Sequence, residues 1–169
     1  PEIHSKTTAK EIWEQSNHRI DGLVTGVGTG GTVTGCATYL KKVNPECKIY
    51  AVEPKKSAVI SGCNPGSHSI QGIGAGFIPK VLRKELIDEI LTIDDDEAFY
   101  FGRLLAKKEG LLSGISSGAA IAATIKIAKR KELSGKRLVV ILPSFGERYL
   151  STAMFDNNTS IISREDGYL

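Results

Sequence analysis

The sequence predicts a three-layer α/β protein, in which a mostly parallel sheet carries helices on both faces. Short apolar runs alternate along the chain with segments in which apolar side chains recur at helical spacing. The apolar runs are continuous, which is typical of strands covered on both faces. With 169 residues, of which 41% are hydrophobic, the chain is long enough for one domain with a buried core.

The first part of the chain contains two predicted helices and two predicted strands. Residues 8–15 form a short helix, and residues 22–25 form an apolar strand. Residues 32–43 form a second helix, which ends at an Asn-Pro pair because proline cannot continue a helix. Residues 48–52 form the second strand. The glycine-rich residues 55–79 show little periodicity, and long irregular segments in compact domains are usually functional or mobile.

The second part of the chain continues this alternation. Residues 87–93 are a predicted strand, and the acidic residues 94–97 open a helix that ends at Gly110. Negative charge in a first turn suits the helix dipole, so we interpret the acidic run as a helix cap rather than a metal site. A further helix covers residues 119–131, and residues 137–142 form an apolar strand.

A glycine-rich turn joins the first strand to the next helix. It runs Gly-Val-Gly-Thr-Gly-Gly-Thr from Gly26 to Thr32. Glycines let backbone N–H groups approach a ligand closely, because no Cβ blocks the approach. The helix N-terminus that follows adds unpaired N–H groups and a partial positive charge. The turn therefore predicts an anion site, most often one for a phosphate.

Three kinds of phosphate ligand are candidates for this turn. A nucleotide P-loop ends in a lysine followed by Ser or Thr, and the absence of that lysine excludes it. A dinucleotide fingerprint fits Gly26, Gly28 and Gly31, and Glu53 lies where an acidic residue for the ribose is expected. The third candidate is pyridoxal 5′-phosphate (PLP), which the turn alone does not separate from a dinucleotide.

Four motifs in a fixed order separate these alternatives. They are GTGGT at residues 28–32, QGIGAGFIP at 71–79, GISSGAA at 114–120 and PSFGERYLS at 143–151. Together they closely resemble the C-terminal half of the cysteine synthases, also called O-acetylserine (thiol)-lyases. These are fold-type II PLP enzymes, whose cofactor-binding domain has the tryptophan synthase β-like fold. The resemblance extends from Pro1 to about Asn157.

The resemblance implies roles for residues in each motif. The turn would hold the PLP phosphate through Gly28, Thr29, Gly30, Gly31 and Thr32. An active-site loop would comprise Gly72, Ile73, Gly74 and Ala75. Ser144 would meet the pyridine nitrogen, where a neutral hydroxyl makes the ring a weaker electron sink and favours loss of a β-leaving group over transamination. For Ser116 and Ser117 we expect an ordinary helix cap.

The reaction of this family also needs a residue that this chain lacks, a lysine in Schiff-base linkage with PLP. The family carries this lysine in its N-terminal half. The lysines of this chain lie in charged or helix-surface contexts, such as residues 41–42, 55–56 and 107–108. We therefore expect no catalytic residue in this chain and no activity from the isolated chain. We also expect the sheet to be incomplete at its N-terminal side, with an open edge.

The expected organisation is a cofactor-binding portion over residues 1–156 and a polar tail over residues 157–169, where fraying is expected. The resemblance implies that the full-length protein converts O-acetylserine and sulfide to cysteine and acetate by β-replacement. Alternatives are a β-cyanoalanine synthase or a cystathionine β-synthase-like enzyme, a non-catalytic partner-binding module of the same fold, and an NAD-binding Rossmann domain. A homodimer and a complex with serine acetyltransferase are also implied.

Composition restricts partners and location. The net charge is +3, and the basic residues at 126–131 are typical of a solvated helix face, so we expect no nucleic-acid partner. The sequence has no apolar run long enough to span a membrane, so we expect no membrane partner. Its cysteines and histidines do not have the spacing of metal ligands, so we expect no bound metal. The 3 cysteines indicate free thiols and a cytoplasmic location. Because the chain opens at Pro1 directly into a helix, we expect a piece of a larger protein, so an organelle is not excluded.

Overall fold

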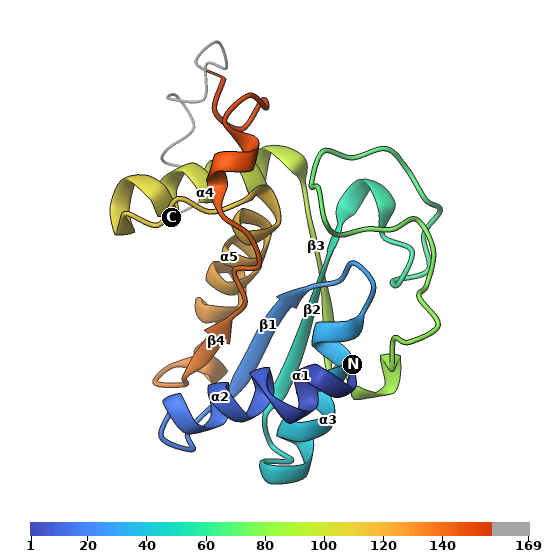
Figure 1. The fold of residues 1–169 in the computed structure, drawn as a ribbon, viewed down its shortest axis with the longest axis vertical. Helices are drawn as coiled ribbons and strands as arrows, with labels where there is room; N and C mark the ends of the chain where they lie inside the picture. The colour runs from blue at the N-terminus through green and yellow to red at the C-terminus, as the bar shows by residue number, and fades with distance from the viewer. Residues whose placement is uncertain (157–169) are drawn as a thin grey trace.

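One parallel sheet organises the structure. The computed structural model describes residues 1–156, and the tail expected at residues 157–169 lies outside the described part. The described residues form a 4-stranded sheet in the order β3-β2-β1-β4 (Figure 1). Its strands are β1 (Gly22–Gly26), β2 (Lys48–Pro54), β3 (Glu89–Ile93) and β4 (Leu138–Val140). All pairs are parallel, and Gly22 is in register with Lys48 of β2 and Leu138 of β4.

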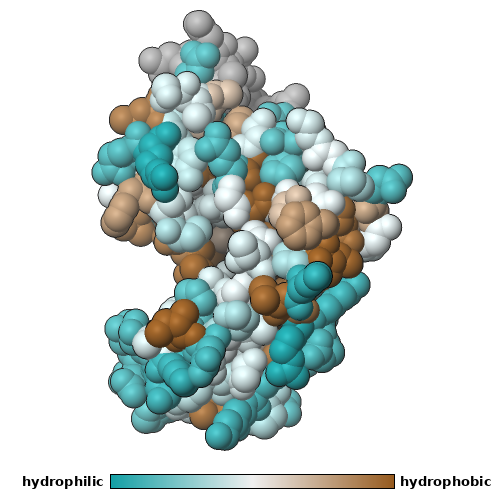
Figure 2. All heavy atoms as spheres, turned by 45° about the vertical axis from the view of Figure 1, so that its right-hand side comes forward, coloured by the Kyte–Doolittle hydropathy of each residue, from teal (hydrophilic) through white to brown (hydrophobic). Residues whose placement is uncertain are grey.

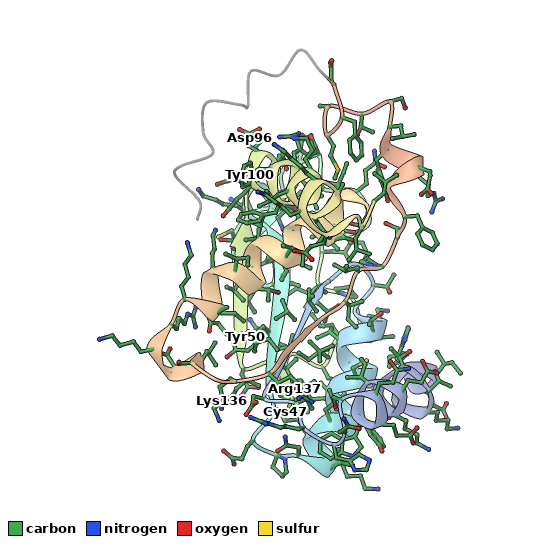
Figure 3. The ribbon with its side chains drawn as sticks, turned by 90° about the vertical axis from the view of Figure 1, so that its left-hand side faces the viewer. Cys47, Tyr50, Asp96, Tyr100, Lys136 and Arg137 are labelled. Atoms are coloured by element: carbon green, nitrogen blue, oxygen red, sulfur yellow. The ribbon has the colours of Figure 1, made fainter. Side chains whose placement is uncertain are left out.

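Helices cover both faces of this sheet. One face carries α1 (Glu2–Lys6), α2 (Thr8–Gln15) and α3 (Gly31–Val43), and the other carries α4 (Asp95–Glu109) and α5 (Ile115–Ala128). Figure 3 shows the sheet between these two layers. Side chains alternate along β1, so Leu23 joins the core beneath α3 and Val24 joins the core beneath α5. The predicted three-layer α/β arrangement is confirmed.

Two helices differ from those that the sequence predicts. The pattern does not predict α1, which packs on α3 where Gly35 leaves room, since a Cβ there would overlap the carbonyl oxygen of Pro1. The last helix begins at Ile115 rather than at residue 119. Gly118 lies inside its first turns, and glycine is required there because a Cβ would overlap the carbonyl oxygen of Ala98 on α4. In both cases a glycine permits close helix packing.

The remaining boundaries agree more closely with the pattern. The helix that was expected to stop at Gly110 does so, and Gly110 takes a left-handed conformation with φ of +69°. The last strand is shorter than the predicted 137–142. It comprises Leu138–Val140, the stretch that pairs with β1, and β4 has no strand on its other side among the described residues. Among the described residues, β3 and β4 are both edge strands, and either provides an open edge of the kind that the sequence predicts.

The acidic run at the start of α4 does not cap the helix as expected. Asp94 is the N-cap residue, but its side chain makes no capping hydrogen bond. Instead, Asp94 pairs with Lys55 and Asp95 pairs with Lys56, each at 2.8 Å between oxygen and Nζ. The position in the first turn still suits the helix dipole. The acidic residues thus bind lysines that the sequence places on a solvated face, and they attach the segment after β2 to α4.

The basic residues around the end of α5 are also partly paired. Lys126 Nζ lies 2.7 Å from a carboxylate oxygen of Glu97. Arg130 donates to both carboxylate oxygens of Glu89, each at 2.7 Å. This bidentate pair joins the end of α5 to the start of β3, because the guanidinium fork matches the carboxylate geometry. Two of the positive charges in this cluster therefore bind other elements of the fold.

Hydrophobic side chains also reach the surface. The face turned forward in Figure 2 shows brown hydrophobic patches among teal hydrophilic ones. Large exposed hydrophobic side chains occur in the irregular segment and around the turn after β4, including Phe77, Ile78, Leu111, Phe145 and Leu150. Grouped apolar side chains of this kind are typical of surfaces that contact another protein segment.

Within residues 1–156, every helix is too short or too polar to cross a bilayer.

Asp88, directly before β3, holds three elements together at the amino ends of the strands. Its carboxylate accepts hydrogen bonds from Lys41 Nζ at 2.7 Å, Lys48 Nζ at 3.2 Å and the backbone N–H of Ile49 at 2.8 Å. Burial alone would raise the pKa of Asp88. The hydrogen bonds from Lys41, Ile49 and Lys48 outweigh burial, so the pKa lies below its ordinary value. The ionised carboxylate is therefore the form that stabilises the fold.

This arrangement predicts a pH-dependent contribution to stability. A carboxyl group whose pKa is lowered by folding stabilises the protein above its unfolded-state pKa, and that stability is lost as the pH falls through the folded-state pKa. Asp88→Asn should lower the free energy of unfolding by about 1–2 kcal/mol near neutral pH. Below about pH 3 the difference should shrink, since the wild-type carboxyl is then protonated too. Urea unfolding of both proteins at the two pH values measures this, and an equal difference at both would contradict it.

Candidate functional site

The glycine-rich turn lies at the carboxyl end of β1 and leads into α3 (Figure 1). Gly30 is the N-cap residue of α3 and has φ of +81°, a conformation that favours glycine. Gly31 and Thr32 open the helix, so their backbone N–H groups have no partner within it. The structure therefore forms the strand, turn and helix N-terminus that the sequence predicts for an anion site.

Residues 72–75 pack directly on this turn. The backbone N–H of Gly74 donates to the carbonyl oxygen of Val27 at 3.0 Å. A Cβ on Gly28 would overlap the carbonyl oxygen of Gly72, so the two backbones touch at this point. The fold thus brings together two of the motifs that the sequence separates.

The loop over residues 72–75 is anchored at two of its residues. Gly72 and Gly74 have φ of +91° and +68°, both in the left-handed region. Ile73 between them is buried, and its Cγ2 lies 2.7 Å from the position of a Cβ on Gly26. Ala75 is exposed. The loop is therefore fixed through Ile73 and through the backbone of Gly74, while Gly72 is exposed. The N–H of Gly74 is bonded to Val27, and its carbonyl oxygen lies 3.0 Å from His68 Nε2.

The two threonines of the turn have different surroundings. Thr29 is exposed, whereas Thr32 Oγ1 lies 3.4 Å from Nε2 of His4. The other ring nitrogen of His4 lies 2.9 Å from Thr8 Oγ1. The sequence assigns no role to His4, and its spacing of four residues from Thr8 is the one local signal that relates the two side chains. His4 therefore connects α1 and α2 to the turn.

Ser144 belongs to a second group of predicted site residues, which lies after β4. Its carbonyl oxygen accepts from the backbone N–H of Gly114 at 2.9 Å, and the adjacent Ser113 and Phe145 form an antiparallel bridge. Ser144 Oγ lies 3.2 Å from the hydroxyl oxygen of Tyr149. The start of α5 and the segment after β4 therefore hold Ser144 between them.

Ser116 and Ser117 do not cap α5, contrary to expectation. The N-cap residue is Gly114, and both serines lie within the first turn with 4% and 0% of their surface exposed. Ser117 Oγ is buried without a hydrogen-bond partner. Ser116 Oγ lies 3.8 Å from the position of a Cβ on Gly72, so the α5 N-terminus adjoins the loop over residues 72–75. The predicted site residues therefore form two groups. One is the glycine-rich turn with residues 72–75, and the other is Ser144 with the start of α5, which adjoins that loop.

Comparison with protein families identifies the chain. Residues 1–144 match the family described as "Pyridoxal-phosphate dependent enzyme". The chain belongs to the pyridoxal-phosphate dependent enzymes. The PLP cofactor that the sequence predicts is thereby confirmed as the cofactor of the family.

Among relatives of this PLP-dependent chain are named cysteine synthases. It is 54% identical over 166 residues to "Cysteine synthase" of Buchnera aphidicola subsp. Schizaphis graminum, covering 94% of this chain and 52% of that protein. It is 49% identical to "Cysteine synthase A" of Escherichia coli K12, covering 92% of this chain and 50% of that protein. The predicted resemblance is confirmed, and the chain spans about half the length of these relatives.

Solved structures agree with this relationship. O-acetyl serine sulfhydrylase isoform 3 from Entamoeba histolytica superposes with a TM-score of 0.89 at 48% identity, covering 91% of this chain and 46% of that one. O-ureido-L-serine synthase superposes with a TM-score of 0.87 at 40% identity, covering 93% of this chain and 50% of that one. The predicted fold class is confirmed by these fold-type II neighbours.

The residues present in this PLP-dependent chain fit a phosphate ester. Gly28 and Gly30 occupy positions where a Cβ would press on Gly72 or Leu82, so the backbone of the turn is bare at these two positions. A bare backbone exposes N–H donors to an anion. The hydroxyl of Thr29 is exposed and adds a donor of the kind that a phosphate accepts.

Glu53 is not available for the ribose that a dinucleotide would present. Only 1% of its surface is exposed. Its carboxylate accepts from the backbone N–H groups of Ile60 at 2.9 Å and Ser61 at 3.0 Å, and from the Ser61 hydroxyl. Because the acceptor oxygens are used within the loop after β2, the dinucleotide interpretation loses the acidic residue on which it depends.

The lysines and the two buried cysteines of this chain lack the features of an activated nucleophile. Among residues 1–156, no lysine is buried. Burial raises the pKa of the Cys36 thiol to about 11 and that of the Cys47 thiol to about 11, so both stay protonated at neutral pH. The described residues also contain no cluster of three or more metal-ligating side chains.

Proposed function

We propose that this chain is the cofactor-binding half of a cysteine synthase. The packing of residues 72–75 on the glycine-rich turn carries the proposal, because it unites a phosphate site with a loop that can meet an amino-acid substrate. The names of the relatives and their high identity support the same reaction. Catalysis would also require the lysine, which must come from a polypeptide segment other than residues 1–169.

The proposed reaction is a β-replacement. The Cβ–O bond of O-acetylserine breaks after loss of the Cα proton, and acetate leaves with the bonding electrons. Sulfide then forms a C–S bond at Cβ while a proton returns to Cα, which gives cysteine. PLP, when bound, supplies the electron sink that makes the Cα proton acidic.

Residues of this chain would bind and orient the reacting groups. The backbone from Gly28 to Thr32 and the Thr29 hydroxyl would hold the phosphate. Ser144 would meet the ring nitrogen, and Gly72, Ile73, Gly74 and Ala75 would form the substrate loop. A closing loop of this kind excludes water and positions substrate. The left-handed φ at Gly72 and Gly74 favours glycine at both positions, and the Gly74 N–H holds the loop on Val27 of the turn.

Other protein segments would complete this half. The side of β4 that has no strand partner within residues 1–156, together with the exposed Leu111, Phe145 and Leu150, supports contact with a second half that provides the lysine. We also propose a homodimer, a complex with serine acetyltransferase and a cytoplasmic location, for which the free thiols of Cys36, Cys47 and Cys63 are suited.

The proposal predicts phosphate-dependent binding without turnover. Pyridoxine 5′-phosphate, which has no aldehyde and cannot react with surface lysines, should bind the purified chain at least tenfold more tightly than pyridoxine, a difference of ~1.4 kcal/mol. With PLP and borohydride, the chain should give no single-site lysine adduct and no cysteine from O-acetylserine and sulfide. Equal binding of both compounds would end the phosphate assignment.

A chimera tests the reaction itself. Residues 1–156 would replace the matched half of the Buchnera cysteine synthase, which provides its own N-terminal half. This chimera should bind PLP and form cysteine from O-acetylserine and sulfide. A folded, PLP-loaded chimera that used only cyanide or homocysteine as nucleophile would favour the β-cyanoalanine or cystathionine alternative. One that formed no product would favour a non-catalytic module.

A further inference from the structure

The hydroxyls of Ser144 and Tyr149 form a pair in the segment after β4. Their oxygens lie 3.2 Å apart, and either could be the donor by geometry alone. Tyr149 is buried, with 7% of its surface exposed, whereas Ser144 is half-buried. Ser144 is thus the member that can reach a ligand, and Tyr149 lies behind it.

The backbone fixes both members of the pair. Thr152 donates through its backbone N–H at 2.9 Å and its hydroxyl at 2.6 Å to the carbonyl oxygen of Tyr149. Gly114 lies against both side chains: a Cβ there would overlap Ser144 Oγ and lie 2.5 Å from Tyr149 Cε2. The pair is therefore an arrangement that three separate segments hold in place.

The chemistry of the two hydroxyls decides the direction of the hydrogen bond. Each hydroxyl has one proton to donate and lone pairs to accept. A phenol is a stronger acid than an aliphatic alcohol, so the favoured direction is from Tyr149 to Ser144. In that direction the proton of Ser144 is free to point toward a ligand. In the opposite direction Ser144 could only accept from a ligand N–H.

We propose that Tyr149 is a positioning residue that fixes Ser144 as a donor to the pyridine nitrogen of the cofactor and thereby keeps that nitrogen unprotonated. This inference rests on the proposed function, since it assumes that Ser144 meets the ring. It goes beyond that function by assigning the protonation state of the ring to a residue that does not touch it. An unprotonated ring withdraws electrons less strongly, which suits elimination and replacement.

The test is a titration of pyridoxine 5′-phosphate bound to the full chain. Its absorbance reports protonation of the ring nitrogen and needs no lysine. In the wild-type complex the nitrogen should titrate below the free compound. In Tyr149→Phe, Ser144 can rotate to accept from a protonated nitrogen, so the pKa should rise by about one unit, the equivalent of one hydrogen bond.

Matched variants separate this role from a structural one. Tyr39→Phe makes the same chemical change on α3, where Tyr39 is half-buried and packs against the core on the other face of the sheet, and it should leave the titration unchanged. Ser144→Ala should raise the pKa as well, and adding Tyr149→Phe to it should have no further effect, because Tyr149 acts through Ser144. Thr152→Val, which loosens Tyr149, should give a smaller rise in the same direction.

The outcomes are distinguishable. Failure of pyridoxine 5′-phosphate to bind the wild-type chain counts against the proposed function. Binding with a Ser144→Ala titration equal to wild type removes Ser144 from the ring nitrogen. Binding with a response to Ser144→Ala, but none to Tyr149→Phe or to Thr152→Val, overturns the role of Tyr149. If Tyr149→Phe does not fold, Thr152→Val alone decides.

Discussion

Replacing Gly118 with alanine is expected to lower the free energy of unfolding by about 3 kcal/mol, at the upper end of the range for overpacked cores. In an exposed helix the same change would stabilise the protein by about 1 kcal/mol, because alanine is the better helix former. Here the added Cβ would overlap the carbonyl oxygen of Ala98 and lie 2.8 Å from the backbone nitrogen of Gly102. Both are backbone atoms of α4, so relief requires α4 and α5 to separate.

The opposite side of the same contact offers the control. A Cβ on Gly102 would mainly meet Cε of Met154, the flexible end of a long side chain, and would lie 3.8 Å from Gly118 Cα. Gly102→Ala should therefore cost about 1 kcal/mol, since Met154 can change rotamer. Urea unfolding of the two variants measures both values. A Gly118→Ala protein as stable as Gly102→Ala would show that the helices do not approach as closely as described.

The second large effect is expected at the site. Gly28→Ala should reduce binding of pyridoxine 5′-phosphate at least tenfold, a loss of ~1.4 kcal/mol, and also lower the stability of the fold by about 1–3 kcal/mol. The new Cβ would overlap the carbonyl oxygen of Gly72. The turn and the loop over residues 72–75 would then move apart, and the N–H groups that we propose as phosphate donors would lose their alignment.

Gly31 in the same turn is the matched control for stability. A Cβ there would meet only Thr29 Oγ1 at 3.7 Å and the nitrogen of Pro1 at 3.9 Å, which are ordinary contacts. Gly31→Ala should therefore leave the stability unchanged or raise it by about 0.5 kcal/mol. Isothermal titration for binding and thermal unfolding for stability distinguish the two variants. Equal stability of Gly28→Ala and Gly31→Ala would refute the steric argument.

Most of the fold can be predicted from local patterns. The apolar runs that become β1, β2 and β3 can be recognised as strands in the sequence, because each strand is covered on both faces and is therefore continuously apolar. Gly110 ends its helix as predicted, since glycine is the residue that adopts a left-handed conformation at little cost. The start of α5 cannot be predicted in this way, because serines such as Ser116 and Ser117 are typical of the residues that cap a helix. The contact between Gly118 and Ala98 explains only why glycine is tolerated inside this helix, since it allows α4 and α5 to approach.

The sequence proposes a set of candidate site residues but not their arrangement. Glycines in a strand-to-helix turn are a local signal for an anion, so the turn at Gly28 can be recognised without a structure. Glu53 matches the spacing of a ribose-binding acid, yet it is buried and bonded to Ile60 and Ser61. Spacing along the chain does not report burial, which is why the dinucleotide interpretation could be tested only in three dimensions.

The amino-acid sequence by itself determined the order of strands and helices, the turn that can hold a phosphate and the family resemblance, because periodicity and glycine content act over a few neighbouring residues. The tertiary structure alone decided which distant groups meet: Gly72 with Gly28, Tyr149 with Ser144, and the lysines after β2 with the acids of α4. These contacts depend on helix packing and side-chain direction, which no local pattern encodes.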